Sequence, residues 1–169
     1  PLDTLQAYTQ ETTGANLQAD SAVFELETQG GIVVDAHLSG AMSNRLVAEG
    51  ATPALPVELT KSDMFDLMPY ENSLVVFEMT GAELKEILER SYRNYWYYTY
   101  EDDYGGYSHY TTCSLATNAG NVIEYLDSGA AVPPDGDDVL SLTIDGVAVD
   151  LTDDVTTFTV STVNYVAAG

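Results

Sequence analysis

The chain has 169 residues, a formal net charge of −22 and a hydrophobic content of 45%, which together predict one acidic globular domain over residues 1–169. Five basic residues are too few for binding a nucleic-acid polymer or an anionic membrane surface, so both are excluded as partners. No apolar run approaches the roughly 18 residues that membrane insertion needs. Acidity of this degree suits secretion, a cell-surface position or high salt, and composition leaves all three open. We expect both ends of the chain to be cut from a longer polypeptide.

A first helix is predicted over residues 11–27, where apolar residues recur at helical spacing. Thr12 or Thr13 is placed to cap its first turn. Four large residues are expected on its apolar face: Leu17, Val23, Phe24 and Leu26. The apolar run that follows, residues 32–42, predicts a buried strand that leads into a turn of small residues.

A short second helix is predicted over residues 60–67, with Ser62 as its cap. The tight turn Pro-Tyr-Glu-Asn separates this helix from the next apolar run. That run, residues 73–79, predicts a second strand.

The third helix has the clearest signals. Thr80 and Glu83 have the spacing of a capping box at the start of residues 81–95. Its apolar stripe is expected to contain Leu84, Ile87, Leu88 and Tyr92.

Strands dominate the rest of the chain. We expect them at residues 110–117, 122–127, 139–146 and 158–166. A hairpin is predicted around Asp145-Gly146, because this dipeptide favours a two-residue turn. Helices that alternate with strands early, followed by strands late, predict an α+β (mixed α/β) fold in which mixed β-sheet layers are flanked by helices.

Residues 92–110 hold eight of the twelve tyrosines and the single tryptophan. Such a segment could extend a ligand pocket toward a sugar or a second base. It could equally form an edge hairpin whose tyrosines pack on the domain. The sequence does not decide between the two.

Asp35 and His37 have the Asp-x-His spacing that begins the metal site of binuclear phosphoesterases. Such a site needs several more His, Asn and Asp ligands, and His109 is the only other histidine. We therefore expect His37 to pack along a strand or to face solvent, and we expect neither a metal site nor a catalytic residue in this chain. The single cysteine, Cys113, is expected to be a buried structural residue.

The better candidates are aromatic. Pro69 fixes a tight turn that can hold Tyr70 in the open, where its ring could stack on a purine or pyrimidine. Asn72 carries a donor and an acceptor that could bond a base edge. Arg45, in a glycine-containing turn, suits ribose or phosphate oxygens. The competing interpretations are that Tyr70 covers the end of the sheet and that Arg45 forms a surface ion pair.

Read in order, five segments resemble the C-terminal domain of the 5'-nucleotidase family, which includes secreted nucleotidases, UDP-sugar hydrolases and 2',3'-cyclic nucleotide phosphodiesterases. The resemblance covers nearly the whole chain. The segments are Glu11-Thr12 with Asn16-Leu17 and Ala19-Asp20, Ser39-Gly40-Ala41 through Arg45, Lys61-Ser62-Asp63-Met64-Phe65 through Leu74, Met79-Thr80-Gly81-Ala82-Glu83-Leu84-Lys85, and Asn164-Tyr165-Val166-Ala167-Ala168-Gly169.

The resemblance implies a substrate-binding role for five residues. Tyr70 and Tyr165 would sandwich the nucleobase of a small-molecule nucleoside or nucleotide, and Asn72 would hydrogen-bond it. Arg45 would lie on the ribose and phosphate side. Gly105 would let the ligand approach the backbone.

The resemblance also implies where catalysis occurs. In the family, a separate N-terminal metallophosphoesterase domain of the same polypeptide carries two divalent metal ions and hydrolyses the phosphoester. The present domain would then hold no cofactor of its own, would be inactive alone, and would belong to an extracellular, cell-surface or periplasmic protein. The alternative is a non-enzymatic surface or carbohydrate-binding module on the same fold.

Overall fold

The computed structural model describes residues 11–40, 59–97, 99–101, 107–109, 115–126 and 137–168. Its helices are α1 (Thr13–Glu25), which continues into the π-helical turn η1 (Leu26–Gly30), α2 (Lys61–Leu67), α3 (Gly81–Tyr97) and α4 (Asn164–Ala167). Its strands are β1 (Ala36–Gly40), β2 (Leu74–Thr80), β3 (Thr99–Glu101), β4 (Tyr107–His109), β5 (Leu115–Ala116), β6 (Val122–Tyr125), β7 (Val139–Ile144), β8 (Val147–Ala148) and β9 (Thr157–Val163).

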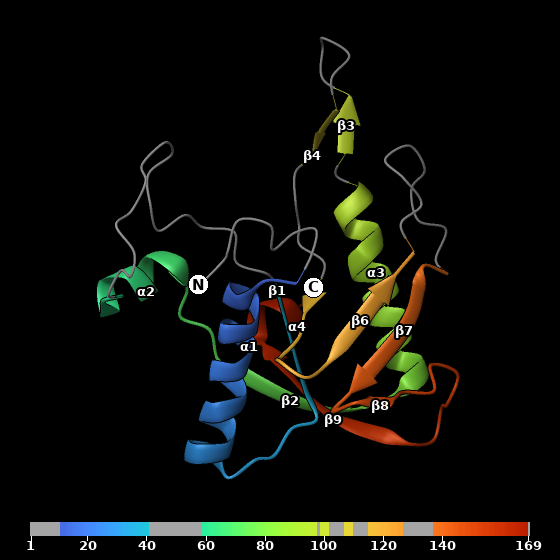
Figure 1. Cartoon of the computed structure of the whole chain (residues 1–169), viewed down its shortest axis with the longest axis horizontal. Coiled ribbons are helices and arrows are strands. Elements are labelled where there is room, and N and C mark those ends of the chain that lie inside the picture. Colours follow the sequence, from blue (N-terminus) through green and yellow to red (C-terminus); the bar gives the residue numbers. More distant parts are fainter. Residues whose placement is uncertain are drawn as a thin grey trace.

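Three sheets are present in the described residues (Figure 1). The largest has the order β2-β9-β1-β5, in which β9 is antiparallel to β2 but parallel to β1. Strands β6, β7 and β8 form an antiparallel sheet, and β3 pairs with β4. Helix α3 passes behind β6 and β7, while α1 stands beside the four-stranded sheet. Mixed and antiparallel sheets with flanking helices confirm the predicted α+β fold.

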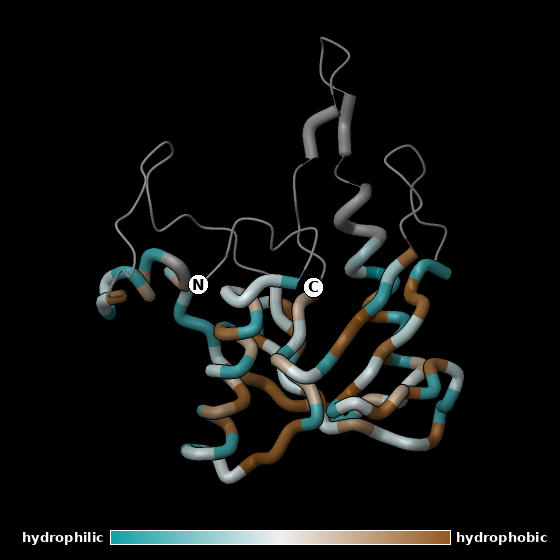
Figure 2. Tube along the Cα trace, in the orientation of Figure 1, coloured by the Kyte–Doolittle hydropathy of each residue, from teal (hydrophilic) through white to brown (hydrophobic). Residues whose placement is uncertain are grey.

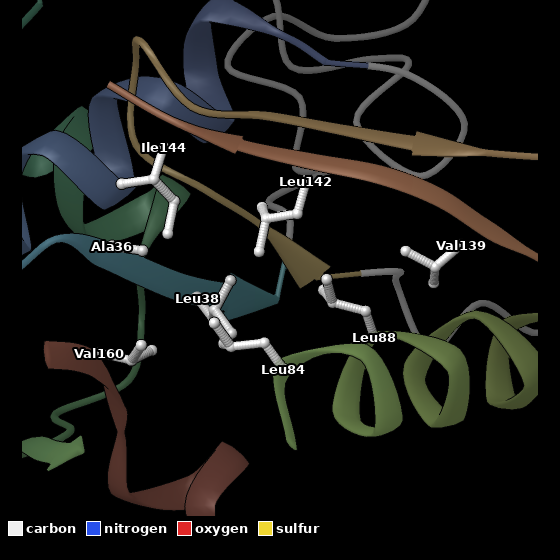
Figure 3. Packing of buried hydrophobic residues seen from close by; sticks show 8 residues of the cluster. All are labelled: Ala36, Leu38, Leu84, Leu88, Val139, Leu142, Ile144 and Val160. Carbon is white, nitrogen blue, oxygen red and sulfur yellow. The ribbon is translucent and has the colours of Figure 1, made fainter. Parts of the chain in front are cut away.

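The hydrophobic core lies between α3 and the two larger sheets (Figure 3). Its buried members are Ala36, Leu38, Leu84, Leu88, Val139, Leu142, Ile144 and Val160. The predicted stripe of α3 is confirmed at Leu84, Leu88 and Tyr92, which are all buried. It was wrong at Ile87, which is 36% exposed. Successive side chains of an α-helix are rotated by about 100° around its axis. The Ile87 side chain therefore lies at the edge of the stripe formed by Leu84, Leu88 and Tyr92.

Helix α1 begins as expected, with Thr12 accepting a hydrogen bond from the Ala15 N–H at 3.2 Å. Of its predicted apolar face, Leu26 is confirmed as buried, but Leu17 and Phe24 are exposed, at 39% and 65%. The helix α1 instead buries small residues such as Ala15 and Ala19. Small side chains allow the helix backbone to approach the sheet closely. Ala15 and Ala19 lie outside the core cluster, which indicates that α1 covers the opposite face of the sheet.

The predicted strand 32–42 is shorter in the structure. Strand β1 starts only at Ala36, where its pairing with β9 begins, and Ile32 and Val33 before it are exposed. Figure 2 shows this exposed segment as hydrophobic between η1 and β1. Residues without a partner strand have no ladder to join, whatever their hydropathy. Residues 41 and 42 lie outside the described part of the chain.

Helices α2 and α3 each begin with a capping box. Thr80 and Glu83 confirm the prediction, because the Glu83 carboxylate accepts the Thr80 N–H at 2.8 Å. For α2 the predicted cap was wrong. Thr60, rather than Ser62, caps the helix, and the Asp63 carboxylate accepts the Thr60 N–H at 2.6 Å.

The hairpin between β7 and β8 is confirmed. Asp145 and Gly146 both have positive φ, 48° and 77°, which is the conformation of a two-residue type I′ turn. Within residues 92–110, the first part belongs to α3, and β3 pairs antiparallel with β4, while the role of the tyrosines in this segment stays undecided. None of the described helices combines the length and hydrophobicity needed to cross a bilayer.

Asn121 links the two larger sheets. Its side-chain NH₂ donates to the Asp35 carbonyl at 3.1 Å, directly before β1. Its side-chain oxygen accepts the Asp145 N–H at 3.0 Å, in the β7–β8 turn. One amide thus fixes the start of β1 against a turn of the other sheet.

His37 is 1% exposed on β1 and hydrogen-bonds through Nδ1 to the Ser161 Oγ at 2.8 Å. Burial lowers the pKa of His37 from 6.5 to about 4. The expectation that His37 packs in a strand is therefore confirmed, and the imidazole is neutral at pH 7.

We expect His37 to make the domain sensitive to mild acid. Between pH 6.5 and 4 the unfolded chain binds a proton at His37 that the folded chain does not, so stability falls as pH falls. Between pH 7 and pH 5 this group should cost about 2 kcal/mol of unfolding free energy. Urea unfolding at both pH values should show that loss for the wild type and a smaller one for His37→Asn. Equal losses in the two proteins would contradict the assignment.

Gly81 lies under the turn before β9. A Cβ on Gly81 would lie 2.0 Å from the Asp150 carbonyl oxygen, and the neighbouring Ala82 N–H donates to the Asp153 carbonyl at 3.0 Å. The start of α3 and this turn therefore require a residue without a side chain between them.

Replacing Gly81 with alanine should lower the free energy of unfolding by about 2–3 kcal/mol, because backbone must move to admit one methyl group. Gly30→Ala is the matched control, since its Cβ would meet Ile32 only at an ordinary 3.5 Å. Chemical denaturation of both variants measures the difference. The packing account is wrong if Gly81→Ala unfolds at the wild-type denaturant concentration.

Candidate ligand-binding site

The β2–β9 ladder brings two distant segments to one end of the sheet. Its last pair at this end is Leu74 with Val163. The residues just before Leu74 and just after Val163 therefore emerge together, although about 90 positions separate them in the sequence.

Two hydrogen bonds extend the ladder beyond its last strand pair. The Asn164 N–H donates to the Ser73 carbonyl at 2.8 Å, and the Ser73 N–H donates to the Asn164 Oδ1 at 2.9 Å. Asn164 is also the first residue of α4. The side chain of one asparagine thus ties the segment before β2 to the turn after β9.

Tyr70 and Tyr165 flank this connection. Tyr70 lies three residues before Ser73 and is 80% exposed, while Tyr165 follows Asn164 and is 78% exposed. Neither ring is buried, so Tyr70 does not cover the sheet end as the competing interpretation required. Asn72, between Tyr70 and Ser73, is exposed as well. Three of the five predicted site residues therefore share one end of the β2–β9 pair.

The approach to Tyr70 is fixed by α2. The Met68 N–H donates to the Met64 carbonyl at 2.9 Å, which completes the last turn of the helix. Pro69 then prevents the helix from continuing, because proline has no N–H to donate. The chain leaves α2 and reaches β2 within the short segment that carries Tyr70.

The sequence-based account missed two features of this end. Residues 158–166 were predicted as one strand, but β9 ends at Val163 and Tyr165 lies in the helical turn α4. The positioning role of Asn164 was also missed. Its only signal was an asparagine directly after a β-branched run, where a side chain able to bond the backbone often ends a strand.

The remaining site predictions fall outside the described residues. Arg45 and Gly105 both lie there, as does Cys113, so their expected roles stay predictions. For His109 only its position in β4 is described.

Asp35 and His37 are both hydrogen-bonded within the sheet. The Asp35 carboxylate accepts the Thr159 N–H at 2.7 Å, and the His37 ring is bonded to Ser161. Both side chains thus hold β1 against β9. Within the described ranges, no three His, Cys, Asp or Glu residues are grouped so that they could hold a metal ion.

Two solved structures are similar to this chain, and the first of them shares its fold. A protein assigned as a 5'-nucleotidase from Staphylococcus aureus, in complex with alpha-ketoglutarate, matches with a TM-score of 0.61 at 22% sequence identity. That match covers 100% of this chain and 31% of the other. Thermus thermophilus sulfate thiohydrolase SoxB, in complex with glycerol, matches with a TM-score of 0.46 at 17% identity, over 85% of this chain and 23% of the other. The chain thus corresponds to less than a third of each solved protein.

No curated protein matches the chain in sequence. A family model described as the 5'-nucleotidase C-terminal domain, however, matches residues 2–169. This match extends over essentially the whole sequence and agrees with the resemblance found in the five motif segments. The chain belongs to the 5'-nucleotidase C-terminal domain family.

Proposed function

We propose that this domain binds the base of a nucleoside or nucleotide between Tyr70 and Tyr165, as part of a phosphoester hydrolase. Asn72 bonds the edge of the base, and Arg45 and Gly105 contribute on the ribose side. Hydrolysis belongs to an N-terminal domain of the same polypeptide that holds two divalent metal ions. The whole protein is extracellular, on the cell surface or periplasmic.

The observation that carries this proposal is the exposure of two tyrosine rings at one end of the β2–β9 pair. A large aromatic side chain stabilises a fold mainly through burial of its ring. These two rings are about four-fifths exposed, so they contribute little to the stability of the domain. Stacking a base on an aromatic ring contributes roughly 1–3 kcal/mol. Because the Ser73–Asn164 hydrogen bonds already order both segments, less conformational entropy is lost when a ligand binds.

The division of labour is supported by the use of Asp35 and His37 within the sheet. The Asp35 carboxylate accepts the Thr159 N–H, and the His37 ring, which is 1% exposed, is bonded to Ser161, so both side chains connect the start of β1 to β9 inside the fold. The described residues therefore favour a binding domain whose reaction chemistry is supplied by another domain.

Removing one ring should weaken nucleoside binding about 5- to 150-fold, the equivalent of the energy of one stacked base. Isothermal titration calorimetry with adenosine and uridine measures this loss for Tyr70→Ala and Tyr165→Ala. Tyr70→Phe is the matched control, because it keeps the ring and should keep most of the affinity. Both positions are exposed, so circular dichroism should show the same fold in every variant.

Two results would count against the proposal. One is nucleoside affinity that is unchanged in both alanine variants. The other is binding of simple sugars without any binding of nucleosides, which would support the carbohydrate-binding alternative.

The isolated domain should not hydrolyse phosphoesters in the presence of Mn²⁺, Mg²⁺ or Zn²⁺. Release of inorganic phosphate from adenosine monophosphate, and of nitrophenol from p-nitrophenyl phosphate, measures this directly. Turnover that increases with added metal, and that is lost in His37→Asn, would show that catalysis resides in this chain.

A further inference from the structure

The surroundings of the two tyrosines are acidic. Residues 59–73 contain one lysine, Lys61, and three acids, Asp63, Asp66 and Glu71, so their net charge is −2. Residues 157–168, which carry Tyr165, contain no charged residue at all. Glu71 is exposed and directly follows Tyr70 in the sequence. The whole chain, at −22, adds a negative field over this entire end.

Two backbone N–H groups at this end, each at the start of a helix, are already used within the protein. The Thr60 N–H at the start of α2 donates to the Asp63 carboxylate at 2.6 Å. The Asn164 N–H at the start of α4 donates to the Ser73 carbonyl. The N–H group at the start of each of these two short helices is thus bonded within the protein.

The basic residues do little to neutralise the negative charge around the two tyrosines. Lys85, Arg90 and Arg93 are on α3, where Glu83, Glu86 and Glu89 balance them, and Lys85 pairs with Asp137 at 2.6 Å. Residues 41–58 carry Arg45 together with Glu49 and Glu58, a net charge of −1. Even with Arg45 counted, the segments before β2 are more acidic than basic.

The polar groups at this end suit an uncharged ligand. Two exposed rings provide flat faces, and the Asn72 amide provides one acceptor and donor hydrogens for a heterocycle edge. None of these groups neutralises a negative charge. A phosphate group carries about two negative charges at neutral pH, and it would meet repulsion here.

We infer that the aromatic end selects the uncharged nucleoside moiety, and that a phosphate group weakens binding to this domain. This inference rests on the proposed function and narrows its ligand class. The domain would bind nucleosides better than the corresponding monophosphates, and monophosphates better than diphosphates. Because the repulsion is electrostatic, salt reduces it, since the screening length shrinks from about 8 Å at 0.15 M to about 3 Å at 1 M.

The test is calorimetric titration of the chain with adenosine, adenosine monophosphate and adenosine diphosphate, in buffer that contains a chelator. At about 0.1 M NaCl the monophosphate should bind about tenfold more weakly than adenosine. At 1 M NaCl the difference in affinity between adenosine and its monophosphate should fall to less than about threefold. Salt should raise the affinity for the monophosphate, while the affinity for adenosine varies little with salt.

A charge variant locates the effect. Glu71→Gln should reduce the ratio of adenosine affinity to monophosphate affinity by about two- to threefold. Asp154→Asn is the matched control, because it makes the same charge change in the exposed turn before β9, about 20 Å of strand away from Tyr165. It should leave this ratio nearly unchanged.

The outcomes separate the two proposals. If no nucleoside binds, or if binding is the same in Tyr70→Ala, the proposed function fails and the inference fails with it. If binding depends on Tyr70 but the monophosphate binds as tightly as adenosine or more tightly, only the inference is overturned. Equal effects of Glu71→Gln and Asp154→Asn would likewise overturn the local role of Glu71.

Discussion

The antiparallel ladder between β2 and β9 is the constraint on which the rest of the structure depends. It runs through seven residue pairs, from Leu74 with Val163 to Thr80 with Thr157. At one end it carries the exposed tyrosines, and at the other the chain turns directly into α3, which fills the core. A slip of one residue in this register would turn Val160 out of the core and would separate the two tyrosine segments. One hydrogen-bonding pattern therefore fixes both the stability of the domain and the geometry of its candidate site.

The two ends of this ladder have different chemistry. At the α3 end, Gly81 lies against the Asp150 carbonyl, and close packing leaves no room for a side chain. At the tyrosine end, Asn164 ties the backbone together while the adjacent rings remain exposed. Rigid backbone beneath exposed aromatic side chains is what recognition of a flat ligand requires, because less freedom is lost on binding. In the binding mode that we infer, the acidic surroundings act on the charge of the ligand rather than on its shape.

Local signals in the sequence predicted local structure well. The capping box at Thr80 and the Asp145-Gly146 hairpin depend on neighbouring residues alone, and both were confirmed. Features that depend on distant residues were harder to predict. The predicted strand 32–42 began too early, because pairing of β1 with β9 starts only at Ala36. The predicted face of the first helix was right at Leu26 but wrong at Phe24, because α1 itself buries small side chains such as Ala15. For the site, local chemistry indicated Tyr70 and Asn72, and the family resemblance added Tyr165. The hydrogen bonds of Asn164 that join their segments depend on tertiary structure.

The account makes one central claim, that Tyr70 and Tyr165 contact opposite faces of the same heterocycle. Nuclear Overhauser effects between bound adenosine and protein with isotopically labelled tyrosines test this claim most directly. The base protons should show contacts to both ring systems, together with the upfield shifts that stacking between two aromatic faces produces. Contacts confined to tyrosines of residues 92–110, or contacts to only one of the two rings with no upfield shift of the base protons, would contradict it.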